Sequence, residues 1–157
     1  MKLRRKSLKT VIVAISRILF ILYIIMLAYF LFFSERYGRT IVSNEYRYNL
    51  TILKEVRRFI TYRELIGFES FVVNIFGNIF AFAPFGFVLP IISNKNRGFW
   101  NITLLSLEFS LTIELIQLLF KVGIFDVDDI IMNTIGGMIG YLCFFIGHKI
   151  YKSLSNL

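Results

Sequence analysis

The sequence predicts an all-α integral membrane protein in which a single domain, residues 1–157, forms a bundle of four transmembrane helices. Of its 157 residues, 57% are hydrophobic and only 18% are charged, and a water-soluble domain of this size could not bury so much apolar surface. The basic residues flank the apolar runs and form no separate basic domain. This pattern favours a role in membrane topology and argues against nucleic-acid binding.

Each predicted span is an apolar run close to the roughly 20 residues that cross a bilayer as a helix. Residues 11–33 follow five basic residues, but the run is too long for a signal peptide and lacks a small-residue cleavage site. Residues 71–92 carry no charge, and residues 99–120 contain two glutamates. Residues 130–147 form the fourth run, which is short but uncharged.

The distribution of lysine and arginine predicts that both termini are cytoplasmic. The N-terminal segment has five basic residues and the C-terminal end has Lys149 and Lys152, and neither segment contains an acidic residue. The turn between the second and third spans has Lys95 and Arg97, again with no acid. Because short cytoplasmic loops are enriched in basic residues, these three segments are assigned to the inner side.

An amphipathic helix is predicted in the long outer connection, residues 34–70. One helical face holds apolar residues and the other charged residues. They are Ile52, Leu53, Val56, Phe59 and Ile60 on the first, and Lys54, Glu55, Arg57 and Arg58 on the second. This helix would lie in the outer interface as a surface anchor, or fold over the bundle as a lid. In the second case its basic residues would contact an anionic headgroup or the acidic residues below. The basic residues in question are Arg57, Arg58 and Arg63.

Polar or small residues form a stripe at helical spacing in each of the last three spans. The stripes are Asn74, Gly77, Asn78 and Ala81; Thr103, Ser106, Ser110, Glu114 and Gln117; and Asn133, Gly136, Gly137 and Gly140. Because polar groups are costly beside lipid and small residues let helices approach closely, the three stripes should face one another.

The outer ends of these stripes predict a binding site in the outer leaflet. At 1.5 Å per residue, their polar side chains lie within about 10 Å of the outer boundary. The short loop at residues 126–129 adds three aspartates just above them. The predicted binding residues are Asn74, Asn78, Glu114, Gln117, Asp126, Asp128, Asp129 and Asn133.

Three spanning residues permit more than one interpretation. Glu108 lies near the predicted midplane, about 120° around the helix from Glu114. It is protonated, paired with Arg17 or a hydroxyl of the first helix, or in contact with another subunit. Arg17 is interpreted as extending its side chain to the inner surface. Pro84 should kink the second span, with a broken helix that lines a cavity as the alternative.

Few features of the sequence indicate catalysis. It contains no glycine-rich phosphate loop, nucleophile triad or metal-ligand set, so neither a metal nor a cofactor is expected. Cys143 is the single cysteine, which excludes a disulfide within the chain. If the protein were an enzyme, Glu114 and Asp129 would be its acid and base. A structural hydrogen-bonding network would give the same pattern.

Several of these residues lie in motifs that resemble those of the VanZ-like family. Residues 74–78 (NIFGN) and 82–86 (FAPFG) look like its first signature. The family's second signature is resembled by Glu114-x-x-Gln117 together with residues 126–129 (DVDD) and 133–137 (NTIGG). Residues 48–50 (YNL) look like a weaker motif, and the resemblance covers about residues 15–145.

Two positions depart from the family pattern. After the Asn-Leu pair the family often has proline and phenylalanine, where this chain has residues 51–53 (TIL). It also often has an arginine just before the acidic loop, where this chain has Gly123 and Ile124. Both departures concern the outer loops and not the spans.

The resemblance implies a small multi-pass protein of the bacterial plasma membrane, associated with reduced susceptibility to teicoplanin and related lipoglycopeptides. The first hypothesis is a non-enzymatic cell-envelope protein whose outer site binds a membrane lipid, a lipid-linked cell-wall precursor or a lipoglycopeptide. One alternative is an intramembrane enzyme that modifies a lipid-linked substrate. Another is a small transporter, which would need to be oligomeric because four helices are few; the sequence leaves the oligomeric state open.

Overall fold

The computed structural model describes residues 2–33, 45–54, 57–58, 61–62, 68–93, 95 and 97–155. Four helices and two short strands account for most of this part of the chain. They are α1 (Lys2–Phe33), β1 (Tyr48–Asn49), α3 (Phe68–Ile92), α4 (Phe99–Phe120), β2 (Phe125–Asp126) and α5 (Val127–Ser155). The all-helical class is confirmed, and α4 has the bounds predicted for the third span. The fourth helix is longer than predicted at both ends.

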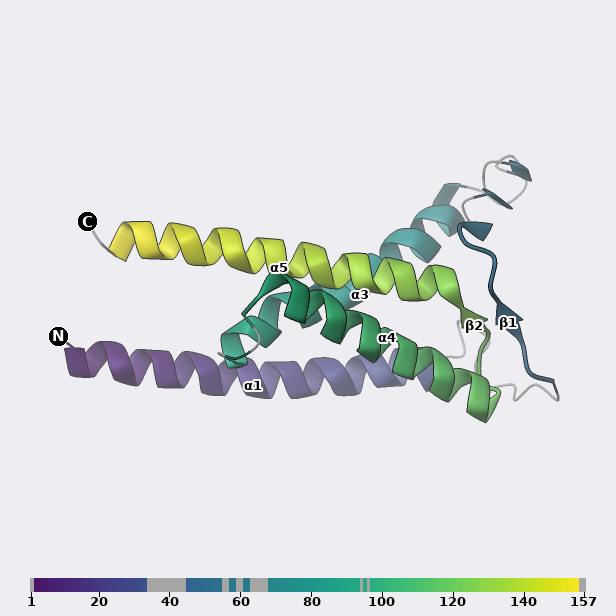
Figure 1. Ribbon diagram of the computed structural model, residues 1–157. Helices are drawn as coiled ribbons and strands as arrows, with labels where there is room; N and C mark the ends of the chain where they lie inside the picture. Colours follow the sequence, from purple (N-terminus) through teal and green to yellow (C-terminus); the bar gives the residue numbers. More distant parts are fainter. Residues whose placement is uncertain are drawn as a thin grey trace.

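The helices lie side by side, with both termini at one end of the bundle and the β1–β2 pair at the other (Figure 1). The turn between α3 and α4 points toward the end that holds the termini. There Tyr141 of α5 donates a hydrogen bond to the carbonyl of Arg97, at 2.9 Å. The chain therefore runs back and forth along the bundle, with α1 and α4 in one direction and α3 and α5 in the other.

Three helical segments are long and apolar enough to cross a membrane: Thr10–Phe33, Phe99–Phe120 and Val127–Leu154. A shorter apolar segment, Phe76–Ile92, belongs to α3. Helix α1 exposes a continuous apolar surface that includes Ile18, Leu22 and Ile25. Such a surface is typical of contact with lipid, because a soluble protein rarely leaves so large an apolar patch in water.

Glycine allows α3 and α5 to pack with their backbones in contact. A Cβ atom added at Gly86 would overlap the backbone of Gly137, and one added at Gly140 would overlap the carbonyl of Ala83. A Cβ at Gly136 would likewise fall on the backbone of Ile79. These close approaches explain why α5 has glycine at these positions, as in other membrane helix pairs with small residues at the interface.

The predicted stripes of α4 and α5 do face the interior, whereas that of α3 is partly wrong. Ser106, Ser110, Glu114 and Gln117 of α4 are buried, as are Asn133, Gly136, Gly137 and Gly140 of α5. Gly77 of α3 is instead exposed, with open space where its Cβ would be. The face of α3 that meets α5 is set by Ile79, Ala83, Gly86 and Phe87, whose backbones approach the glycines of α5.

Pro84 and Pro90 both lie within α3, which continues to Ile92. The helix is therefore not broken at Pro84, and the alternative of a discontinuous helix is wrong. A helix in a membrane protein tolerates proline where neighbouring helices surround the freed backbone groups. Here Pro90 is buried and Pro84 is half-buried.

Aromatic rings join three of the helices at one level of the bundle. The ring of Phe20 on α1 lies 5.8 Å from that of Phe85 on α3, and Phe85 stacks on Phe109 of α4 at 5.0 Å. On the side of the strands, Leu27, Phe82 and Ile113 form a buried apolar cluster. These contacts fix the relative heights of α1, α3 and α4.

Candidate functional site

The two short strands bring distant parts of the chain together at the end of the bundle away from the termini. β1 and β2 are parallel, and their register places Asn49 beside Asp126. The Asn49 side-chain amide donates to both carboxylate oxygens of Asp126, at 3.0 and 3.1 Å. The side-chain oxygen of Asn49, Oδ1, accepts the backbone N–H of Thr51 at 3.2 Å. Asn49 therefore holds the outer connection against the start of α5.

Asp126 joins this connection to α4 and α5. Its backbone N–H donates to Glu114 Oε2 at 2.9 Å, and its side chain accepts the backbone N–H of Asp128 at 2.9 Å. The second contact is an N-cap, because a carboxylate just before a helix satisfies a backbone N–H of the first turn. Glu114 is almost fully buried, so this contact fixes a carboxyl group inside the bundle.

The two acidic residues in the first turn of α5 bind different neighbours. Asp128 accepts the backbone N–H of Leu53 at 2.5 Å, and Asp129 accepts the side-chain amide of Asn78 at 2.6 Å. Leu53 has a positive φ of 58°, which is uncommon outside glycine. Carboxylates are also favourable at this position because the helix N-terminus carries partial positive charge.

Two buried amides also join the helices at this end of the bundle. Asn133 of α5 donates to Ser110 Oγ of α4 at 2.9 Å, and Gln117 of α4 donates to the carbonyl of Leu31 of α1 at 3.0 Å. Asn133 is 3% exposed and Gln117 is 1% exposed. The amide oxygens of both side chains accept no hydrogen bond from the described part of the chain. A buried acceptor without a donor costs about 1–3 kcal/mol, so these oxygens are suited to receive a donor from outside the chain.

These contacts connect most of the predicted binding residues into one polar network. Asn78 binds Asp129, which lies one helical turn from Asn133. Asn133 binds Ser110, which lies one turn from Glu114, and Glu114 binds the backbone of Asp126. We call the set the outer polar network. Its members are Asn49, Asn78, Ser110, Glu114, Gln117, Asp126, Asp128, Asp129 and Asn133.

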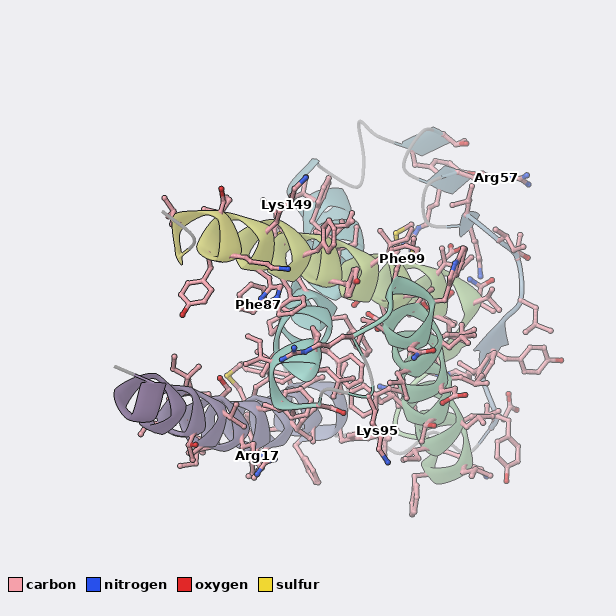
Figure 2. All side chains as sticks on the ribbon, turned by 60° about the vertical axis from the view of Figure 1, so that its left-hand side comes forward. Arg17, Arg57, Phe87, Lys95, Phe99 and Lys149 are labelled. Carbon is pink, nitrogen blue, oxygen red and sulfur yellow. The ribbon has the colours of Figure 1, made fainter. Side chains whose placement is uncertain are left out.

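Some of the predicted residues lie apart from this network or outside it. Arg57 and Arg58 are exposed, and Figure 2 shows Arg57 pointing away from the helices. Arg63, the side chain of Asn74 and four residues of the predicted amphipathic helix (55, 56, 59 and 60) lie outside the described residues. The amphipathic helix, like the lid hypothesis, thus stays a prediction.

Sequence reasoning missed Asn49 and Ser110 as members. Ser110 belonged to a predicted stripe but not to the site, and Asn49 was noted only as part of the YNL motif. The position of Asn49 beside Asp126 depends on a strand pair between residues 77 positions apart. Local spacing carries no signal for such a pair.

The chemistry of the network is that of hydrogen-bond acceptors held in fixed orientations. Within the described ranges, no group of three or more His, Cys, Asp or Glu side chains is arranged to hold a metal ion. The hydrogen bonds given above orient each carboxylate through backbone or amide N–H groups. The arrangement is therefore suited to recognise hydroxyl, amide or ammonium donors.

The comparison with known proteins agrees with the motifs in this network. The model of the VanZ/LLP1 family matches residues 20–148. The chain belongs to the VanZ/LLP1 family. The matched range of this VanZ/LLP1 member contains both strands, α3, α4 and the part of α5 that enters the network. It thus covers the whole site.

One relative of this VanZ/LLP1 protein is Protein VanZ of Enterococcus faecium. The two are 32% identical over 137 residues, which is 86% of this chain and 76% of the relative. No solved structure matches the chain. Family membership therefore comes from sequence, and the geometry above comes from the structure.

Proposed function

We propose that this protein is a non-enzymatic, single-domain membrane protein of the bacterial cell envelope that lowers susceptibility to teicoplanin and related lipoglycopeptides. Membership of the VanZ/LLP1 family and similarity to Protein VanZ support this proposal. The protein would act by binding an amphiphilic ligand, either a lipid-linked cell-wall precursor or the lipoglycopeptide itself. Its site would be the outer polar network.

The proposal includes four spans with both termini in the cytoplasm of the bacterial cell. Three apolar helices are long enough to cross a bilayer, and α3 lies between them with a shorter apolar segment. Lys149 of α5 and the turn that carries Lys95 and Arg97 lie toward the end of the bundle that holds the termini (Figure 1), and basic residues favour the cytoplasmic side. The outer polar network would then lie at the outer leaflet, where an extracellular amphiphile arrives.

The observation that carries the proposal is the pair of buried amide oxygens without a hydrogen-bond donor, Gln117 Oε1 and Asn133 Oδ1. Buried polar groups in proteins almost always have partners, and each exception calls for an explanation such as a functional role. Lipid-linked wall precursors and lipoglycopeptides both carry many hydroxyl and amide donors beside a hydrocarbon chain. Such a ligand could donate to the network while its chain stays in lipid.

The same geometry supports binding over acid–base catalysis. Glu114 Oε2 accepts the backbone N–H of Asp126, and Asp129 Oδ1 accepts the amide of Asn78. The two carboxyl groups suggested as an acid–base pair thus hold structural elements in place. Because Glu114 and Asp129 each contact a different segment, each one positions that segment.

The test is antibiotic susceptibility in a sensitive bacterial host that expresses the full chain. Expression should raise the inhibitory concentration of teicoplanin more than that of a glycopeptide without an acyl chain. Glu114→Gln and Asp129→Asn should both return it toward that of cells without the protein, because each removes a charged acceptor. Membrane levels of each variant are measured in parallel.

Thr134→Val is the matched control for these variants. Thr134 follows Asn133, but its hydroxyl donates within the helix to the carbonyl of Ile130 at 2.7 Å. Its replacement should leave resistance unchanged. Full resistance in well-expressed Glu114→Gln and Asp129→Asn would contradict the proposed site. Absence of any resistance from the wild-type chain would contradict the proposed function.

A further inference from the structure

Two opposite charges on the outside of the bundle have no partner within the described chain. Glu108 on α4 and Arg17 on α1 are both exposed. Neither side chain forms an ion pair or hydrogen bond with another described residue. The sequence left open whether Glu108 pairs with Arg17 in the same molecule, and the structure gives no such contact. Each charge therefore faces the surroundings of the helices.

Glu108 points directly away from the rest of the molecule. It lies about 160° around α4 from Ser106 and Ser110, the two serines that face the interior. Asn101 and Thr112 are also exposed, and they fall within about 40° of Glu108 on the helix surface. We call Asn101, Glu108 and Thr112 the polar stripe of α4. Three exposed leucines lie beside it on the same face of the helix, namely Leu104, Leu111 and Leu115.

The hydroxyl of Thr112 does not donate a hydrogen bond to the carboxyl group of Glu108. It donates instead to the backbone carbonyl of that residue, at 2.7 Å. The carboxyl group would consequently face the hydrocarbon core of the membrane in a single copy of the chain. An ionisable group at that depth is costly and normally faces another protein segment. A second helix against this face would remove the cost.

The height of Arg17 matches that of Glu108. The rings of Phe20, Phe85 and Phe109 lie in contact across α1, α3 and α4 and define a common level. Arg17 precedes Phe20 by three residues, or about 4.5 Å, toward the end that holds the termini, and Glu108 precedes Phe109 by about 1.5 Å in the same direction. The two charges thus differ in height by about 3 Å.

We propose that the polar stripe of α4 is an interface for a second copy of this chain, in which Arg17 of one copy pairs with Glu108 of the other. The charges are complementary and lie at one height, and α1 is covered on one side only. Figure 2 shows Arg17 on the side of α1 turned away from α5. Each copy offers one charge of each sign, so a closed symmetric assembly uses all of them.

A charge-reversal experiment in intact membranes tests the interface. Two populations of the full chain carry donor and acceptor fluorophores at their C-termini, and energy transfer between them reports association. Wild type should associate. Arg17→Glu alone places two glutamates together, and Glu108→Arg alone places two arginines together. Each should reduce association at least about tenfold, because like charges in a low-dielectric medium repel strongly.

Co-expression of the two variants distinguishes pairing between copies from pairing within one copy. An Arg17→Glu chain retains Glu108, and a Glu108→Arg chain retains Arg17, so the mixture contains one native and one reversed pair. Association should return in the mixture and also in the double variant. Lys149→Glu has the same charge change at an exposed position of α5 and should associate as wild type.

The neutral variants Arg17→Gln and Glu108→Gln are controls for the possibility that a charge-reversed chain misfolds. Both should weaken association less than the reversals do. Monomeric wild-type protein would overturn the inference, as would single reversals that associate like wild type or a mixture that does not recover. The inference rests on the spanning arrangement proposed above and not on the ligand. Antibiotic susceptibility measured on the same variants separates a failure of the interface from a failure of the proposed function.

Discussion

At the scale of single residues, the important feature is how each polar group is satisfied. Glu114, Asp128 and Asp129 accept hydrogen bonds from donors that come from other segments of the chain. Asn133 and Gln117 each use the amide nitrogen but leave the oxygen without a donor. Since buried oxygens of this kind destabilise a protein, their presence requires a compensating role. Ligand binding is the role that we propose.

Asn133→Leu separates that role from a contribution to folding. The variant removes a hydrogen bond to Ser110, worth about 1 kcal/mol, and also removes an unpaired oxygen that costs about 1–3 kcal/mol. Stability should therefore stay the same or rise slightly, while resistance should fall. Thermal unfolding in detergent measures the first quantity and antibiotic susceptibility the second. A strong loss of stability with intact resistance would show that Asn133 is purely structural.

At the scale of elements, α3 and α5 owe their contact to small residues at specific positions. Gly86, Gly136 and Gly140 permit this contact, whereas Gly77 has no such neighbour. The sequence alone places Gly77 in a stripe with Asn78 at helical spacing, so the two kinds of glycine look alike. They differ only in what the folded chain places beside them.

The matched pair Gly136→Ala and Gly77→Ala tests this difference. At Gly136 the new methyl group would meet the backbone of Ile79, which cannot move aside as a side chain could. The cost should be about 1–3 kcal/mol or more, as for overpacked sites in general. At Gly77 alanine should stabilise the helix by about 0.5–1 kcal/mol. Equal effects of the two substitutions on thermal unfolding would argue against the α3–α5 packing.

At the scale of the whole molecule, charge and connectivity give the bundle two different ends. One end holds the termini with Lys149 and the turn that carries Lys95 and Arg97. The other holds the outer polar network and the strand pair. This polarity is what a membrane protein needs in order to insert in one orientation.

Accessibility of single cysteines to a membrane-impermeant thiol reagent measures the orientation. The background is Cys143→Ser, which removes the only cysteine of the chain. Arg57→Cys should react in protoplasts, which are intact cells without their wall, because its exposed side chain lies in the connection that is proposed to face outward. Lys152→Cys should react only after the membrane is opened. The reverse pattern would contradict cytoplasmic termini.

The sequence by itself determined the class of the protein, the extent of α4 and the inward-facing stripes of α4 and α5. These depend on local quantities, namely runs of apolar residues and a helical period of 3.6, which a linear sequence contains. The family motifs also marked most of the network, including Asn78, Glu114, Asp126 and Asn133.

Only the tertiary structure decided which neighbours these residues have. It placed Asn49 on Asp126 through a strand pair, turned Gly77 outward and carried α3 through Pro84. Among the described residues it gave Glu108 no ion pair with Arg17. The physical reason is that a hydrogen bond or a helix contact joins two residues far apart in the chain. Helical spacing shows which side of each helix is polar, but the rotation of one helix against another follows from packing of the whole bundle.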